Sequence, residues 1–329
     1  MKTTMKRILA LFLACLAGLG LASCALAPEE AETTAAKTTA AETTTPETTG
    51  EGGTTTPETT GEGGTTAPET TVPATEAPEP EPIVLKIVSM NAQNADYDRS
   101  GEATIEDKYR KLGAAISAKT PDLVLLQECN TVASADGIRQ KMTDASDYAT
   151  VSGKNASTMV LYNTKVFDLM SQGCEKIGSA GDENGSKYDR YMVWARLRHK
   201  ESGAQIVVVP VHVDYATTAC KAQINIIVNY LKTNFPNIPF ILGGDFNLEI
   251  GTISKTSLPT EGYLNARTSA TEKVNGNSAT FPEKGTVIDF IWYKSGLVYR
   301  AAATKYEVIT DTLPTDHRPI YAELTLTRQ

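Results

Sequence analysis

The chain is poor in cysteine. Of its five cysteines, Cys15 and Cys24 lie near the N-terminus, which leaves Cys129, Cys174 and Cys220 in the remainder. Three thiols cannot all pair within one chain, and their spacing matches no metal-binding motif, so a fold built on disulfides is excluded. One disulfide among the three remains open from the sequence.

The first 24 residues contain no acidic side chain. Lys2, Lys6 and Arg7 form a basic head, and the apolar run that follows, 8–22, is too short for a comfortable membrane span but suits the core of a signal peptide. It ends in Leu21-Ala22-Ser23-Cys24, which resembles a bacterial lipobox. We therefore expect a lipoprotein signal peptide over 1–24 and a lipid on Cys24 that anchors an extracytoplasmic protein to the bacterial cell membrane. The alternative is a plain secretory signal with an incidental cysteine.

Residues 25–82 have almost no large apolar side chains. The segment consists mainly of Thr, Pro, Glu, Gly and Ala, and the stretch from Thr43 to Gly53 recurs from Thr54 to Gly64. Such a composition cannot offset the entropy of ordering the chain, and no repeat unit has an apolar face to stack. The sequence therefore predicts a disordered tether over 25–82.

The remaining residues, 83–329, carry no excess of charge of either sign. The whole chain has a net charge of −8, to which residues 1–24 contribute +3 and residues 25–82 contribute −11, so the rest sums to zero. The absence of a basic excess argues against broad electrostatic attraction to nucleic acid, although a local basic patch remains open.

The pattern of apolar residues in 83–329 predicts one α/β domain, because no second linker interrupts it. Strands outnumber helices, and the helices lie between strands, which indicates a substantial mixed or antiparallel sheet component. The expected strands are 84–90, 123–126, 148–151, 158–162, 166–170, 191–198, 205–211, one that begins at Pro239, 287–293, 298–308 and 320–325, and the expected helices are 105–119 and 217–234.

The most informative stretch runs from Ile238 to Leu248. A short apolar strand meets Gly243 and Gly244 and then releases Asp245 and Asn247, two positions apart. Residues i and i+2 of an extended segment point the same way, so these two side chains are expected to address one ligand. The alternative is an ordinary polar turn after a core strand.

Polar side chains recur at the ends of the other apolar strands. They are Asn91, Glu128, His212 and Asp289, together with Asp316 and His317, which precede the last strand. Loops over a rigid scaffold are where catalytic groups usually lie. If these strand ends share one edge of the sheets, they form a cup of carboxylates, amides and imidazoles.

The motifs at these positions resemble the endonuclease/exonuclease/phosphatase superfamily, the type of deoxyribonuclease I and exonuclease III. They are Ser89-Met90-Asn91, Asp122 to Glu128, Val211-His212-Val213, Gly244-Asp245-Phe246-Asn247, Ile288-Asp289-Phe290-Ile291 and Thr315-Asp316-His317-Arg318-Pro319. All six follow the order of that family. The resemblance implies a four-layered α/β sandwich of two packed mixed sheets flanked by helices. It also implies cleavage of phosphoester bonds with a divalent cation, usually Mg²⁺, with Mn²⁺ as the second choice.

The resemblance also implies a role for each residue. Glu128 would be the principal metal carboxylate, helped by Asn91, and Asp316 would lie at the same metal or at a second position. A hard ion such as Mg²⁺ prefers oxygen ligands and keeps several waters, so one or two carboxylates suffice.

The catalytic roles fall to the imidazoles and to the pair at the end of the central strand. His317, oriented by Asp289, would polarise or deprotonate the attacking water or steady the phosphate. Asp245 would orient the water, Asn247 would donate to a phosphate oxygen, and His212 would bind the phosphate or protonate the leaving group. The alternatives are a core histidine at His212 and a structural hydrogen-bond partner at Asp289.

Two further positions bear on the substrate. Arg190 matches a position where members of the family often carry a phosphate-contacting arginine, although basic residues commonly flank strands. Val213-Asp214-Tyr215 departs from the family, whose members usually have a leucine or phenylalanine and then small or polar residues there. Asp214 could reshape the leaving-group side.

The sequence thus predicts a monomeric, metal-dependent phosphoester hydrolase, acting as a phosphodiesterase, nuclease or phosphatase outside the cytoplasm by in-line attack of an activated water. The substrate stays open among nucleic acid, a phospholipid headgroup and an inositol phosphate. The alternative is a non-catalytic surface lipoprotein that keeps the fold only for binding.

Overall fold

The structure is a computed structural model that describes residues 81–96 and 104–329. The predicted signal peptide with Cys24, and the predicted tether as far as residue 80, lie outside the described residues. None of the helices within the described ranges has the length and apolar character needed to cross a membrane.

Two mixed β-sheets form the centre of the domain. The first has seven strands in the order β10-β12-β13-β1-β2-β4-β3, and the second has six in the order β5-β6-β7-β8-β11-β9. In the first sheet the strands are β1 (Ile83–Asn91), β2 (Leu123–Gln127), β3 (Tyr148–Val151), β4 (Thr158–Asn163), β10 (Glu272–Val274), β12 (Tyr299–Val308) and β13 (Ile320–Arg328). In the second they are β5 (Phe167–Gly178), β6 (Arg190–His199), β7 (Gln205–His212), β8 (Phe240–Asp245), β9 (Leu264–Asn265) and β11 (Asp289–Lys294).

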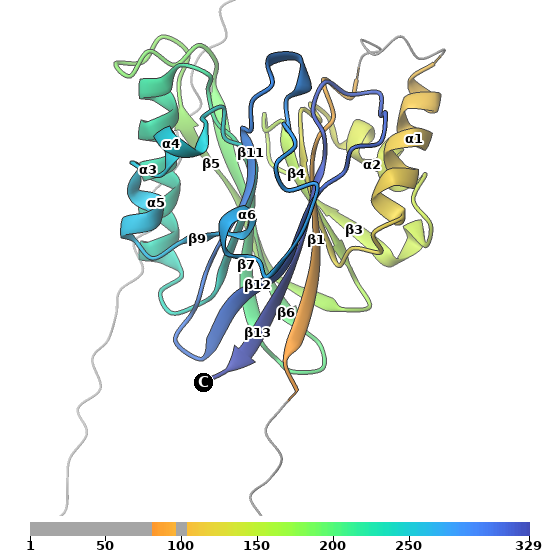
Figure 1. Ribbon diagram of the computed structural model, residues 1–329, viewed down its shortest axis with the longest axis vertical. Coiled ribbons are helices and arrows are strands. Elements are labelled where there is room, and N and C mark those ends of the chain that lie inside the picture. Colours follow the sequence, from red (N-terminus) through yellow and green to blue (C-terminus); the bar gives the residue numbers. More distant parts are fainter. Residues whose placement is uncertain (1–80, 97–103) are drawn as a thin grey trace, which may run out of the picture. The chain divides into compact units, whose positions relative to one another are not determined.

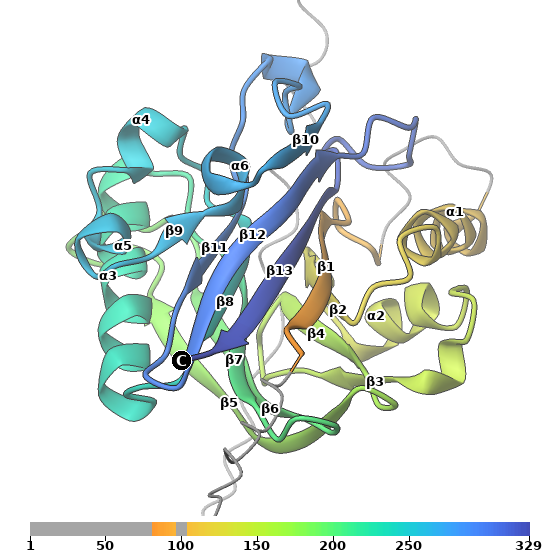
Figure 2. The same ribbon diagram turned by 60° about the horizontal axis from the view of Figure 1, so that its bottom comes forward.

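Helices cover the outer face of each sheet, which gives four layers (Figure 1). The helices over the seven-stranded sheet are α1 (Ile105–Ser117) and α2 (Val132–Arg139). Those over the six-stranded sheet are α3 (Thr217–Asn234), α4 (Ile250–Ile253) and α5 (Ser257–Thr260), while the short α6 (Ala266–Ser269) packs near β11 and β12. Figure 2 shows β12, β13 and β1 side by side in the seven-stranded sheet. The predicted α/β sandwich of two packed mixed sheets is confirmed.

The continuous apolar runs of the central strands follow from burial on both faces. In β1, Leu85 and Ile87 face the core between the sheets, whereas Val88 and Met90 face the core under α1 and α2. In β8 the same alternation places Ile241 between the sheets and its neighbours under α3. Three apolar cores therefore separate the four layers.

The sequence missed α2, which is only eight residues long and contains a glycine. Its N-cap residue Thr131 accepts a hydrogen bond from the Ser134 backbone N–H, which satisfies one of the free donors of the first turn. Gly137 allows close packing, because a Cβ there would collide with the ring of Tyr109 on α1. The N-cap and this close contact, rather than the length of the helix, stabilise α2.

The three cysteines of the domain, Cys129, Cys174 and Cys220, are free thiols, and two of them are buried. The disulfide left open by the sequence is therefore absent from the described residues. Packing, rather than cross-linking, holds the domain together.

Strand register brings the predicted polar strand ends to one edge of the sandwich. Asn91 at the end of β1 lies beside Gln127 at the end of the parallel strand β2. In the other sheet, Asp245 at the end of β8 pairs with both His212 at the end of β7 and Asp289 at the start of β11. The turn that carries Asp316 and His317 enters β13 at the same edge, because Ile320 pairs with Ser89.

Candidate active site

A cavity of about 970 Å³ opens at this edge, between loops of the two sheets. Six of the residues singled out in the sequence line it: Glu128, Arg190, His212, Asp245, Asn247 and His317. Asn91 and Asp289 are buried and make hydrogen bonds to these lining residues. The fold thus brings the predicted side chains from distant parts of the chain to one cavity.

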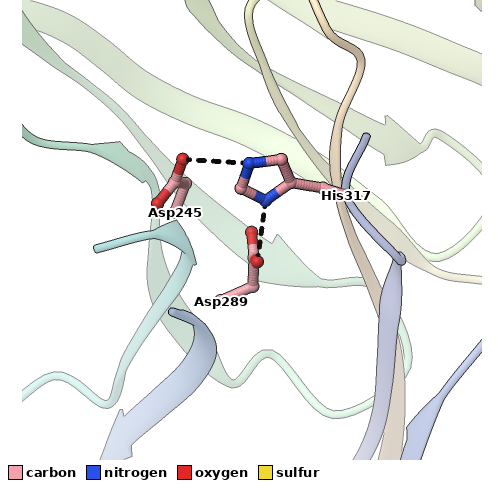
Figure 3. Close-up of side chains that lie close together, drawn as sticks. All are labelled: Asp245, Asp289 and His317. Atoms are coloured by element: carbon pink, nitrogen blue, oxygen red, sulfur yellow. Dashed lines mark hydrogen bonds and ion pairs between the residues drawn. The ribbon is translucent and has the colours of Figure 1, made fainter. Parts of the chain in front are cut away.

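At the floor of the cavity, His317 lies between two aspartates (Figure 3). Its Nδ1 is 2.9 Å from Asp289 Oδ2, and its Nε2 is 3.7 Å from Asp245 Oδ2. Thr280 Oγ1 accepts a hydrogen bond from the backbone N–H of Asp289, and the Phe281 ring stacks on the imidazole with centroids 4.8 Å apart. These contacts fix both the position and the plane of the ring.

The aspartates reverse the effect of burial on His317. Burial alone would lower the pKa of the imidazole, but the charge and hydrogen bond of Asp289, with the charges of Asp245 and Asp316, raise that pKa to about 10. Burial and the negative charge of Asp289 also raise the pKa of Asp245 to about 7. At neutral pH the ring is therefore an imidazolium, and Asp245 exchanges a proton readily.

The second group of predicted residues lies on the β1 and β2 side. Asn91 Nδ2 donates to Glu128 Oε1 at 3.1 Å and to Asp245 Oδ2 at 3.2 Å, and the Asn94 backbone N–H donates to Glu128 Oε2 at 2.8 Å. Glu128 has a φ of +58°, in the left-handed region that a non-glycine residue adopts at a cost. The hydrogen bonds from Asn91 and Asn94 hold the Glu128 carboxylate at the cavity wall in spite of this cost.

Asp316, which directly precedes His317, is half-buried and is not among the residues that line the cavity. Burial raises its pKa; His317 opposes the shift, and the negative charge of Glu128 adds to it. Its Oδ1 is buried and has no hydrogen-bond partner among the described residues. A buried carboxylate oxygen without a partner is costly unless a further group meets it.

His212 lies on the opposite side of Asp245, where Arg190 determines its tautomer. Arg190 Nη1 is 3.2 Å from His212 Nδ1, and a guanidinium only donates, so Nδ1 accepts and the ring proton of the neutral imidazole is on Nε2. That Nε2 is 3.7 Å from Asp245 Oδ2. Burial and the charges of Arg190 and His317 hold the pKa of His212 well below its usual value. His212 is therefore a neutral donor.

Asn247 lines the cavity, but not for the reason that the sequence suggested. The strand ends at Asp245, and Asn247 has a φ of +49°, so the two side chains are not successive members of one face of an extended segment. A turn replaces the strand, in which Asp245 Oδ1 accepts from the Asn247 N–H at 2.8 Å and Asn247 Nδ2 donates to Val213 O at 3.1 Å.

Gly244 is required by the approach of the two strands that carry the site. Its φ is +156°, and a Cβ at this position would collide with the carbonyl oxygen of Val211 on β7. Glycine therefore permits β7 and β8 to meet closely, next to His212 and Asp245.

Four other residues contribute to the site, although sequence pattern indicated no role for them. Thr280 and Phe281 support Asp289 and His317, and Tyr188 and Tyr215 line the mouth of the cavity. Thr280 and Phe281 lie in an irregular loop with no regular pattern of polar residues. The tyrosines could have been noticed in the sequence, because Tyr188 lies two residues before Arg190 and Tyr215 directly follows Asp214.

Two sets of groups at this edge have the donor chemistry for a cation. Ligand atoms of Asp245, Asp289 and His317 all lie within 4.8 Å of one another. In that set, however, both nitrogens of His317 already face carboxylates. The predicted set of Asn91, Glu128 and Asp316 offers only oxygen ligands, one of them the buried Oδ1 without a partner.

Comparison with known proteins identifies the fold. No protein-family model and no curated protein sequence matches this chain. Among solved structures, an endonuclease/exonuclease/phosphatase family protein from Bacteroides thetaiotaomicron is similar with a TM-score of 0.65 and 19% identity, over 74% of this chain and 98% of that one.

Two similar structures carry more specific names. A mannosyl-6-phosphatase from Bacteroides thetaiotaomicron has a TM-score of 0.63 and 20% identity, over 73% of this chain and 99% of its own. TDP2 from D. rerio, complexed with a single-strand DNA product, has a TM-score of 0.57 and 15% identity, over 73% and 98%. At these identities the likeness shows the fold alone: the chain has the fold of the endonuclease/exonuclease/phosphatase proteins.

Proposed function

We propose that the protein is a metal-dependent phosphoester hydrolase in which an activated water attacks phosphorus in line. The observation that carries this proposal is the pairing of an aspartate-held imidazolium, His317, with an aspartate whose pKa is about 7, Asp245, at the floor of a polar cavity. Buried ionisable groups with strongly shifted pKa values are typical of catalytic sites.

The residues present fit a divalent cation. Glu128, Asn91 and Asp316 would hold it, because they offer hard oxygen ligands and because Asp316 Oδ1 is buried without a partner among the described residues. Such an ion supplies positive charge that stabilises the phosphorane-like transition state. Mg²⁺ is the preferred ion, with Mn²⁺ as an alternative.

The chain's own groups divide the remaining work. Asp245, half ionised near neutral pH, accepts the proton of the attacking water. His317 remains charged at that pH and donates to a phosphate oxygen as negative charge develops, so it steadies the phosphate rather than removing a proton from water. Asp289 holds the tautomer and plane of the ring through the bond at Nδ1.

Three further groups are available to the phosphate on the other side of the site. His212 presents its Nε2–H toward the cavity as a neutral donor to the phosphate or to the leaving oxygen. Arg190 contributes a fixed positive charge. The side chain of Asn247, whose Nδ2 also donates to Val213 O, lies at the cavity wall. Positioned donors of this kind contribute most when water is excluded.

The substrate is proposed as a class. The names of the similar structures include a phosphosugar phosphatase and a protein bound to a DNA product, so phosphoesters of both kinds suit this fold. For this chain, nucleic acid, a phospholipid headgroup and an inositol phosphate are all candidates. We further propose that a signal peptide over 1–24, a lipid on Cys24 and the tether place the domain, 83–329, at the outer surface of the cell membrane as a monomer.

The test is a hydrolysis panel with the purified protein. Plasmid DNA, RNA, sphingomyelin, inositol phosphates and sugar phosphates are offered with Mg²⁺ or Mn²⁺ and, in parallel, with EDTA. Release of phosphate or cleavage in the presence of the metal, lost in EDTA and in His317→Ala, is the expected result. Hydrolysis that persists in EDTA or in the variant contradicts the mechanism, and no hydrolysis of any substrate favours a binding protein.

A further inference from the structure

Two tyrosines stand exposed at the mouth of the cavity. Tyr188 and Tyr215 have exposed fractions of 55% and 56%, and both line the cavity. Their rings meet edge to face, with centroids 6.1 Å apart and planes at 66°. Large aromatic rings are rarely left this open in pairs, and they are enriched where proteins bind partners and ligands.

The aromatic corner formed by Tyr188 and Tyr215 is continuous with the proposed phosphate site. The Arg190 guanidinium lies over the Tyr188 ring, 5.3 Å from its centroid, and its Nη1 is 3.2 Å from His212 Nδ1. Tyr215 follows His212 by three residues, in the loop between β7 and α3. A group attached to a phosphate held by Arg190 and His212 would therefore meet the aromatic corner.

Asp214 fastens the two loops that carry the rings. It is fully buried, and its Oδ2 accepts from Ser186 Oγ and from the backbone N–H groups of Lys187 and Tyr188, at 2.8 to 3.2 Å. Its Oδ1 accepts from Ala216 N at 2.9 Å, on the loop of Tyr215. Burial alone would raise the pKa of this carboxyl, but the hydrogen bonds lower it, so Asp214 remains ionised.

Gln223 on α3 completes this hydrogen-bond network, which we call the brace around Asp214. Gln223 Oε1 accepts from the Asp214 backbone N–H at 2.8 Å, and Gln223 Nε2 donates to Ser186 Oγ at 3.1 Å. Gln223 and Ser186 are both buried. A fully hydrogen-bonded buried network is costly to rearrange, so the rings are held in place before any ligand binds.

The charges around the cavity limit the number of phosphates that a ligand can carry. Among the described residues, its lining contains the acidic residues Glu128, Asp189, Asp245 and Glu249 and the cations Arg190, His317 and Lys284. Arg190 and His317 face the proposed phosphate, which leaves Lys284 for the rest of the ligand. A polymer with many phosphates needs several basic contacts along its backbone. This lining suits a ligand with a single phosphate and an uncharged body.

We propose that the aromatic corner binds the ring of a small phosphoester, a monosaccharide or a nucleoside, whose phosphate is the group under attack. This inference rests on the proposed function for the position of the phosphate. The ring stacks on the tyrosines, Arg190 bridges ring and phosphate, and Asp214 is a positioning residue for both loops. The corner thereby selects the alcohol half of the substrate.

The test measures binding separately from turnover. Analogues of glucose 6-phosphate, AMP and glycerol 3-phosphate, in which CH₂ replaces the bridging ester oxygen, are titrated calorimetrically into the protein with Mg²⁺. The better ring analogue is expected to bind at least about tenfold more tightly than the acyclic one, a gain within the range of ring stacking on an aromatic side chain. Whether glucose or adenosine gives that gain identifies the ring.

Variants test whether the preference for cyclic analogues comes from the aromatic corner. Tyr188→Ala and Tyr215→Ala are expected to lose most of the ring preference and keep the affinity for the acyclic analogue, whereas Tyr188→Phe and Tyr215→Phe retain it. Asp214→Asn should reduce the preference without weakening the acyclic analogue. Leu297→Ala, at an exposed side chain in the β11–β12 turn at the opposite end of the strands, serves as the matched control.

Two results would overturn the proposal: equal affinity of wild type for cyclic and acyclic analogues, or a ring preference that survives both alanine substitutions. Because the analogues cannot be hydrolysed, a protein that shows the ring preference but cleaves nothing contradicts only the hydrolase assignment. A protein that cleaves phosphoesters without the ring preference contradicts only the aromatic corner.

Discussion

Replacing Asp289 with asparagine removes the charge that holds His317 protonated and leaves the size of the side chain unchanged. Both residues are buried, and Asp289 Oδ2 lies 2.9 Å from His317 Nδ1. In Asp289→Asn the burial of the imidazole remains, but its strongest negative partner is gone. The pKa of His317, about 10 in the wild type, should therefore fall by several units.

The size of the effect follows from the same contact. Breaking a buried, hydrogen-bonded ion pair by removing one partner typically costs about 3 to 5 kcal/mol. Each pKa unit corresponds to about 1.4 kcal/mol, so a fall from about 10 to the ordinary value of 6.5 corresponds to about 5 kcal/mol, at the upper end of that range. At neutral pH the ring then loses its charge. Loss of one positioned donor from a transition state lowers kcat by about 100- to 1,000-fold.

Proton NMR of the imidazole ring measures this directly. The chain has only three histidines, so their Cε1–H signals can be assigned by substituting each in turn. In the wild type His317 should titrate near pH 10, and in Asp289→Asn near or below the ordinary value of 6.5. His199, at the other end of β6 from Arg190, serves as an internal control. An unchanged titration of His317 in the variant would refute the reasoning.

Three further predictions concern metal, pH and backbone. Glu128→Gln should raise the Mg²⁺ concentration required for half-maximal activity at least about tenfold, measured by metal titration, because a neutral amide is a weaker ligand for a hard cation. His317 binds its proton more tightly in the folded than in the unfolded state, so the stability that it contributes is complete below pH 6.5 and is lost at about 1.4 kcal/mol per pH unit as the pH rises toward 10. Asp245 acts in the same direction up to about pH 7, where the lowered pKa of His212 opposes it, so the fall is expected above pH 7. Urea midpoints at pH 7, 8 and 9 test this, and a midpoint that rises across that range contradicts it. Gly244→Ala should lower the thermal midpoint by several degrees or prevent folding, because its Cβ would meet the Val211 carbonyl; a wild-type midpoint argues against the close approach.

Most of the fold could be predicted because the strands are strongly patterned. The bounds expected for α3 agree with the structure, β1 is longer than expected by one residue at each end, and β2 is longer by one residue at its C-terminal end. Their apolar runs are continuous since both faces are buried, and such runs have a clear beginning and end. The short elements, α2, α4 to α6, β9 and β10, carry no such pattern because packing, rather than local sequence, defines them.

Sequence pattern identified several residues that the fold brings to one cavity, but not how they are arranged there. Polar residues at strand ends identify Asp245 and Asp289, and the antiparallel pairing of β8 and β11 brings the end of one strand beside the start of the other. The turn at Asn247 replaces the expected extended geometry, since a positive φ is not visible in the residue type. Burial and neighbouring charge assign His317 as the cation and His212 as the neutral donor, and neither follows from sequence alone.

The brace around Asp214 shows what lies beyond sequence pattern. Its position after His212 marked it as unusual, but its partners come from a loop more than 25 residues earlier and from α3. Only the fold shows that one carboxylate holds both tyrosine loops. The same distance along the chain separates Asp289 from His317, whose ring it orients, and Thr280 supports Asp289 in turn.

In the proposed mechanism, the site directs water to the phosphorus of a phosphoester. Hydrolysis of the best substrate of the panel in H₂¹⁸O, with Mg²⁺, followed by mass spectrometry of both products, measures where that oxygen goes. We expect one ¹⁸O in the phosphoryl product, none in the alcohol, and loss of the reaction in His317→Ala. Label in the alcohol, or label in phosphate that His317→Ala still releases at the wild-type rate, would contradict it.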